Sequence, residues 1–235
     1  MSWTQVPEPY FKFQEVSKSL HPQRHSFPVT IWEMTDENPK GHIAVDNQDF
    51  APGHLEHSAA LRIITAPLDE LRPESGPGLV KLCQTLKIPH EFLNERLRAV
   101  CHSYGTRTEL EDAGNDSGSG GFCAWFHYLC KAVEPDETRQ RREWDRSAFF
   151  LRKHSAREGG GVTLVMFGPL PEVKRRIQQF IDMKCFRDAI AEPFALFDLV
   201  LDGLFHEVDS TMWQLLEVIY ELENVSSHLI DGIGE

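Results

Sequence analysis

Three short groups of residues in this sequence are of types that could do chemistry. A glycine-rich segment covers residues 115–121, Cys101 is followed by His102, and His54 precedes His57. The glycine-rich segment lacks the Gly-Lys-Ser/Thr that binds phosphates and precedes a predicted strand, which favours a flexible loop over a nucleotide site. The cysteine and the histidines have no third ligand at a fixed spacing, and neither H-E-x-x-H nor C-x-x-C occurs. Surface or hydrogen-bonded residues are therefore favoured over a thiol nucleophile or a metal centre.

Acidic side chains gather at the C-terminal end of the chain. The 235 residues include 24 Lys and Arg and 36 Asp and Glu, which gives a net charge of −12. No Lys or Arg follows Arg187, so the last 48 residues carry eleven acids and a charge of −11. Such a chain lacks the basic face that binds phosphates, and we expect no nucleic-acid partner.

These carboxylates do not predict an active site. They lie on the solvated faces of a predicted helix, where no pocket would raise the pKa of a carboxyl group, and no G-x-S-x-G occurs. We therefore expect no enzyme. Carboxylates of neighbouring copies could instead bind Mg²⁺ or Ca²⁺, because hard cations prefer oxygen ligands. The candidates are Asp198, Asp202 and Asp209. The alternative is a solvated helix face without a ligand.

The N-terminus and the cysteines predict a cytoplasmic chain. The first ten residues hold prolines and an acid rather than the basic start and apolar run of a signal peptide. Five cysteines without C-x-x-C spacing favour reduced thiols in a reducing compartment. The longest apolar stretch, residues 194–205, is interrupted by Asp198, Asp202 and Gly203. No segment approaches the roughly 20 apolar residues that cross a bilayer.

The chain divides into three predicted parts. Residues 1–58 are expected to be an irregular N-terminal extension with one strand at 29–34, and residues 59–190 an α/β domain. Runs of β-branched and aromatic residues predict strands at 61–66, 122–130, 147–152 and 161–167. Pro77, Pro89 and Pro171 open predicted helices, and the charged residues 135–146 predict a loop. Strands interleaved with helices predict a mixed β-sheet covered by helices, an α/β/α arrangement.

Residues 191–235 are predicted to form one long acidic amphipathic helix that packs on the same domain. Apolar residues follow one another at spacings of four and three. They are Phe197, Leu201, Leu204, Val208, Thr211, Leu215, Val218, Leu222 and Val225. This heptad seam is typical of a helix that packs lengthwise on another helix, including a copy of itself. At 1.5 Å per residue the helix would measure roughly 50 Å. Gly203 offers a bend or a close approach.

Three stretches resemble fungal members of the CorA-like magnesium transporter superfamily. They are Leu-Lys-Ile-Pro-His-Glu-Phe-Leu-Asn-Glu-Arg-Leu-Arg at 86–98, Gly-Val-Thr-Leu-Val-Met-Phe-Gly-Pro at 161–169, and the segment 192–213 that starts Glu-Pro-Phe-Ala-Leu-Phe-Asp. The resemblance spans about residues 60–225 in the same order. It implies a cytosolic α/β/α domain whose last helix is a stalk that runs toward a membrane and assembles, in that family, into a pentamer.

The family's Gly-Met-Asn pore motif and its two transmembrane helices do not occur in this sequence. We therefore expect that the chain conducts no ions itself and meets a membrane only through segments that it lacks. The first hypothesis is a regulatory, cation-sensing domain of a CorA-like transporter, with Mg²⁺ as a regulatory ion rather than a required cofactor. The alternative is a stand-alone interaction module that uses its heptad helix for self-association or partner binding. A monomer or dimer is compatible with either hypothesis.

Overall fold

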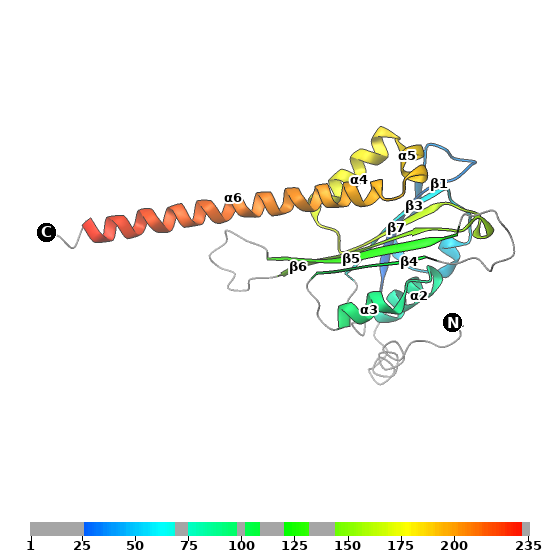
Figure 1. The fold of residues 1–235 in the computed structure, drawn as a ribbon, viewed down its shortest axis with the longest axis horizontal. Helices are drawn as coiled ribbons and strands as arrows, with labels where there is room; N and C mark the ends of the chain where they lie inside the picture. The colour runs from blue at the N-terminus through cyan, green and yellow to red at the C-terminus, as the bar shows by residue number, and fades with distance from the viewer. Residues whose placement is uncertain (1–25, 69–74, 98–101, 109–119, 132–143, 232–235) are drawn as a thin grey trace.

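The protein is built in three layers around a seven-stranded sheet (Figure 1). The computed structural model describes residues 26–68, 75–97, 102–108, 120–131 and 144–231. Helices α2 (Gly76–Thr85) and α3 (His90–Leu97) cover one face of the sheet. Helices α4 (Pro171–Met183), α5 (Phe186–Ala191) and the start of α6 (Ala195–Asp231) cover the other face. The predicted mixed sheet covered by helices, with one long C-terminal helix, is confirmed.

The strand order in the sheet is β2-β1-β3-β7-β6-β5-β4. The strands are β1 (Pro28–Met34), β2 (His42–Asp49), β3 (Leu61–Ala66), β4 (Ser103–Thr108), β5 (Phe122–Lys131), β6 (Trp144–Lys153) and β7 (Val162–Phe167). Only the central pair β3–β7 is parallel, and every other neighbouring pair is antiparallel. Two short 3-10 helices, η1 (Pro52–Leu55) and η2 (Ala156–Glu158), lie in connections.

The central strands are buried on both faces, which explains their continuous apolar sequences. All six residues of β7 are buried, and β3 is nearly as apolar. One face packs Ile64 and Phe150 against α2 and α3, whereas the other packs Leu164 against α4 and α6. Full burial of one such side chain contributes about 1.5–3 kcal/mol. The two cores therefore hold both helix layers on the sheet.

A tight glycine turn brings β7 beside β3. Gly159, Gly160 and Gly161 follow η2 and all have positive φ angles. A Cβ at Gly161 would lie 2.3 Å from the carbonyl oxygen of Ala59, so only glycine fits there. The turn places the Val162 N–H within 3.0 Å of the Ala60 carbonyl oxygen, which starts the parallel pairing.

The predicted strands at 29–34, 61–66, 122–130, 147–152 and 161–167 are confirmed by β1, β3, β5, β6 and β7. The helices predicted after Pro77, Pro89 and Pro171 are confirmed by α2, α3 and α4. The loops predicted at 115–121 and 135–146 lie mostly outside the described residues; of these, 144–146 belong to β6.

Residues 1–58 are predicted to be irregular apart from one strand at 29–34, and for the described part of that segment this is wrong where a second strand forms. Residues 28–34 and 42–49 form β1 and β2 of the same sheet. Strand β2 escaped the sequence analysis because it is an edge strand with a single buried residue, Val45. Strand β4 and the short helix α5 were also missed. For β4 the reason is the same as for β2, because it too is a polar edge strand.

Gly203 allows α6 to lie directly on α4. A Cβ at this position would meet the Val173 Cα at 2.7 Å and the Val173 backbone nitrogen at 2.9 Å. Gly203 is itself buried in the middle of a helix, where glycine costs about 1 kcal/mol relative to alanine. The close approach of the two helices therefore offsets that cost.

We expect Gly203→Ala to lower the free energy of unfolding by about 1–3 kcal/mol, because overpacking against the α4 backbone outweighs the gain in helix propensity. Urea denaturation measures the change. Ser210→Ala, at an exposed position of the same helix, is the matched control and should gain a few tenths of a kcal/mol. A Gly203→Ala protein as stable as the parent would contradict this account of the α4–α6 contact.

Candidate functional site

The first turns of α6 anchor the helix on the sheet. Leu196 and Val200 are completely buried, and Leu204 exposes 4% of its surface. Phe197 packs on Phe126 of β5, with ring centroids 5.1 Å apart. These side chains follow one another along one side of the helix. The N-terminal part of α6 is therefore part of the domain core.

Polar contacts tie the same turns of α6 to α4. The Arg176 guanidinium lies 2.7 Å from the Asp202 carboxylate. One turn later, the Glu207 carboxylate accepts a hydrogen bond of 2.7 Å from the backbone N–H of Glu172. Glu172 stands at the start of α4, where a backbone N–H has no partner within its own helix and a negative charge is favoured.

Beyond these contacts α6 projects away from the sheet (Figure 1). One side of this projecting part carries apolar side chains that are exposed to solvent. Seven large apolar side chains lie at spacings of four and three and each exposes at least 38% of its surface. We call them the apolar stripe; they are Leu201, Phe205, Val208, Met212, Leu215, Ile219 and Leu222. Their spacing places all seven on one side of the helix.

The apolar stripe overlaps the predicted heptad seam only in part. Leu201, Val208, Leu215 and Leu222 belong to both, and Val218 is exposed beside the stripe. Phe197 and Leu204 instead lie in the core, so these two seam positions pack on the sheet and on α4 of the same domain and cannot contact a second copy of α6. The side chain of Val225 lies outside the described residues.

Three residues of the stripe, Phe205, Met212 and Ile219, were missed by the sequence analysis. Each of them lies one residue after a seam position, at 204, 211 or 218. From Leu201 the seam steps by three residues and then four; steps of four and then three would have found them. Together with the seam they form an apolar face of three lengthwise rows of side chains, which we call columns, each with a spacing of seven residues. Such a face is typical of a helix in a bundle, whereas a two-stranded coiled coil needs two columns.

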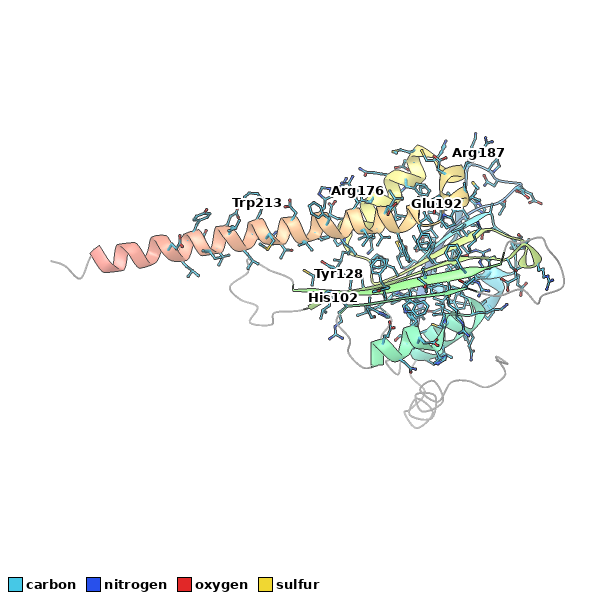
Figure 2. The ribbon with its side chains drawn as sticks, in the orientation of Figure 1. His102, Tyr128, Arg176, Arg187, Glu192 and Trp213 are labelled. Atoms are coloured by element: carbon cyan, nitrogen blue, oxygen red, sulfur yellow. The ribbon has the colours of Figure 1, made fainter. Side chains whose placement is uncertain are left out.

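A groove runs between the stripe and the edge of the sheet. It has a volume of about 770 Å³. Leu201, Phe205 and Val208 form its helix wall, and aromatic residues of β4 and β5 form its sheet wall. Figure 2 shows two of the lining residues, His102 and Tyr128, below α6 near the strand ends; their rings are 6.0 Å apart. We call this the α6–β4 groove.

The candidate metal ligands all lie on α6, four and seven residues apart, and therefore on one side of it. Asp202 forms the ion pair with Arg176 and lies 3.8 Å from His206. Asp198 and Asp209 are exposed. Within the described part of the chain, no three His, Cys, Asp or Glu side chains are grouped as a metal site requires. Cation binding between copies stays a prediction.

The histidines singled out in the sequence occupy separate places. The Nδ1 atom of His54 accepts a hydrogen bond of 3.3 Å from the Ala51 N–H. The carbonyl oxygen of His57 accepts one of 2.7 Å from Arg62. His102 lines the α6–β4 groove, and Cys101 lies outside the described residues.

Ser103, His127 and Glu95 lie close together without the geometry of a hydrolase triad. The Ser103 hydroxyl is 3.0 Å from Nδ1 of His127. The Glu95 carboxylate is 3.5 Å from the same nitrogen and accepts a hydrogen bond of 3.1 Å from the Trp125 indole. A triad needs the hydroxyl and the carboxylate on opposite ring nitrogens. The group therefore connects β4, β5 and α3 instead of forming a nucleophile.

A charged cluster joins the β6–β7 turn to the end of α2. The Arg152 guanidinium donates to the Leu86 carbonyl at 2.7 Å and to the Glu158 carboxylate at 3.0 Å, and Lys87 pairs with the same carboxylate. Burial, together with the nearby Arg152 charge, lowers the pKa of His154 to about 4. This imidazole therefore stays neutral near pH 7 and lies 3.0 Å from the Thr163 hydroxyl.

Comparison with known proteins gives no assignment: no family model, curated protein or solved structure matches the chain. None of the helices in the described ranges is both long enough and apolar enough to cross a membrane.

The lowered pKa of His154 predicts an acid-sensitive fold. The unfolded chain takes up a proton on this imidazole near pH 6.5, whereas the folded protein does so only near pH 4. Stability is therefore lost as the pH falls through this window, by about 1–3 kcal/mol. We expect His154→Gln to remove this part of the pH dependence in urea denaturation series. His42→Gln, at an exposed position, should keep it. An unchanged pH profile in His154→Gln would show that another group is responsible.

Proposed function

We propose that this chain is the soluble, cation-responsive domain of a CorA-like divalent cation transporter, in which α6 is a stalk helix that assembles with copies of itself. One observation carries the proposal: an α/β/α sandwich continues directly into a 37-residue helix that leaves the domain with an apolar stripe exposed. The resemblance of residues 86–98, 161–169 and 192–213 to that family supports it.

The exposed stripe favours assembly. Burying one large apolar side chain contributes about 1.5–3 kcal/mol. Each stripe residue still exposes more than a third of its surface to solvent. Because the face is three columns wide, a single helix can contact two neighbours. Lengthwise packing of several copies would remove this surface from water.

The charge of α6 opposes the same assembly. Seven acids and no Lys or Arg occur between residues 195 and 223. Copies packed side by side bring these carboxylates together, and like charges on neighbouring helices repel. A divalent cation between copies would offset that repulsion with oxygen ligands. Asp198 and Asp209 are the more available candidates, because Asp202 already pairs with Arg176.

The alternative function is a self-associating interaction module without a metal role. The apolar stripe favours it as well, because apolar burial alone needs no cation. The two functions differ in one measurable respect, which is whether assembly depends on a divalent cation.

We expect the average mass in light scattering to rise when millimolar MgCl₂ replaces EDTA at constant ionic strength. Leu215→Glu should abolish the rise, because it places a charge in the stripe at a residue that is 38% exposed and outside the core. Ser210→Glu adds the same charge on the opposite side of the helix and should assemble like the parent. A Leu204→Glu variant would be uninformative, since Leu204 is a core residue.

Two outcomes of this experiment would reject a part of the proposal. If mass ignores Mg²⁺ but falls in Leu215→Glu, the interaction module is correct and cation sensing is wrong. If neither change alters the mass, assembly through the stripe is wrong.

The double variant Asp198→Asn/Asp209→Asn should assemble with little dependence on Mg²⁺, because removing the repulsion also removes the need for the cation. The midpoint of the Mg²⁺ titration, followed by sedimentation velocity, measures the change. Asp182→Asn/Asp188→Asn removes equal charge from exposed positions on α4 and α5 and should leave the midpoint unchanged. Equal effects of the two double variants would assign the response to net charge and not to these carboxylates.

A further inference from the structure

We propose that the α6–β4 groove binds a basic amphipathic helix of another protein. The inference goes beyond the proposed function and does not depend on a cation response. Leu201, Phe205 and Val208 belong to both surfaces, so a helix bound in the groove would cover the first three residues of the apolar stripe.

The layer arrangement shows the space for such a helix. On this face of the sheet, α4 and the start of α6 contact the core through Met166, Leu164 and Phe149 of β7 and β6. α6 covers Phe126 of β5 through Phe197. No described helix covers β4, where Tyr104 exposes 85% of its surface beside the half-buried Tyr128 of β5. Packed helices lie about 8–10 Å apart. A helix placed beside α6 over β4 and β5 would complete the layer.

Both walls of the groove suit an apolar helix face. The sheet wall consists of aromatic rings, and the helix wall holds Leu201, Phe205 and Val208. Phe205 exposes 66% of its surface and Leu201 52%. An amphipathic helix binds such a groove through side chains at i, i+3, i+4 and i+7.

The small size of the groove indicates a reversible complex. Ten of the described residues line the groove, fewer than the roughly 20–30 residues on each side of a standard interface that buries about 800 Å² per partner. We therefore expect a dissociation constant in the micromolar range, on the order of that for small transient interfaces.

The distribution of charge selects a basic partner. Asp198, Asp202 and Asp209 lie on the side of α6 that borders the stripe, and each of the last two directly follows a stripe residue. Among the described residues, those that line the groove include no carboxylate. A bound helix would thus have acids along one flank only, and Lys or Arg at its facing positions would set the choice of partner.

A second copy of this chain fits the groove less well. No Lys or Arg follows Arg187, so α6 of a second copy would bring only acids beside Asp198 and Asp209. Such a pairing places like charges together at positions where opposite charges normally pair. The acids of α6 beside the groove therefore favour a different protein.

The test uses the 235-residue protein and synthetic helical peptides as probes. A fluorescent peptide of three heptads carries Leu at a and d and Lys at e and g; matched peptides carry Gln or Glu in place of Lys. In anisotropy titrations we expect micromolar binding of the Lys peptide and at least tenfold weaker binding of the Glu peptide. Raising the salt from about 50 mM to 500 mM should remove most of this difference, because exposed charges are then screened.

Two sets of variants locate the site. Tyr104→Ala and Phe205→Ala change highly exposed residues and should weaken both the Lys and the Gln peptide about tenfold without altering the urea midpoint. Asp198→Asn/Asp209→Asn should weaken the Lys peptide roughly threefold to tenfold and leave the Gln peptide unchanged. Asp182→Asn/Asp188→Asn, with the same net charge, is the matched control and should bind like the parent.

Three results would overturn the proposal. Equal binding of the Lys peptide by Tyr104→Ala and the parent would exclude the groove. Equal losses in the two charge variants would show unspecific attraction to an acidic protein. An oligomer that dissociates in Tyr104→Ala without added peptide would assign the groove to a second copy. None of these results depends on Mg²⁺, so a failure here is distinct from a failure of cation sensing.

Discussion

The contact between Gly203 of α6 and the backbone of α4 at Val173 sets the direction in which the projecting half of α6 leaves the domain. A larger residue would separate the two helices and tilt α6 away from α4. Because an α-helix is stiff, a small change of angle at this contact moves the distant stripe by many ångströms. The Arg176–Asp202 pair and the bond between Glu207 and the start of α4 hold the same angle from the polar side.

One helix therefore serves three environments in succession. Leu196, Val200 and Leu204 belong to the core, Leu201 and Phe205 line a groove beside the sheet, and Met212, Leu215 and Leu222 are exposed to solvent. The change follows from geometry: the sheet ends while the helix and its apolar pattern continue. Figure 2 shows Arg176 beside the anchored part and Trp213 on the projecting part. The acidic residues of α6 differ in the same way along the helix. Asp202 pairs with Arg176 of α4, whereas Asp209 is exposed.

Much of the fold was predictable because the central strands carry unambiguous patterns. Strand β7, Val-Thr-Leu-Val-Met-Phe, is buried on both faces. Its nearly continuous apolar sequence is typical of such a strand. Strand β2, His-Ile-Ala-Val-Asp-Asn-Gln-Asp, buries only Val45 and belongs to the sheet through backbone pairing with β1, which leaves no pattern in the side chains. Edge strands are held by their neighbours, so their sequences are weakly constrained.

The site was predictable only in part for a related reason. The four-three spacing correctly indicated an apolar helix face, but it could not tell which turns lie on the domain. That distinction depends on where the sheet ends, and the sheet edge at β4 was not recognised. The groove is formed by β4, β5 and α6 together, so a sequence signal for it would need all three elements and their order in the sheet.

The projecting half of α6 also has a consequence for its own persistence as a helix. Its backbone hydrogen bonds receive no cover from the sheet (Figure 1), and most of the stability of a helix in a protein comes from packing that this part lacks. The anchored turns supply the nucleus from which it propagates, so its order should decline with distance from Gly203. Backbone amides would then exchange with solvent in a gradient along the helix, slowest near Val200 and fastest toward Leu222. A neighbour lying along the stripe would flatten that gradient, which makes exchange along α6 a direct record of whether this surface is covered.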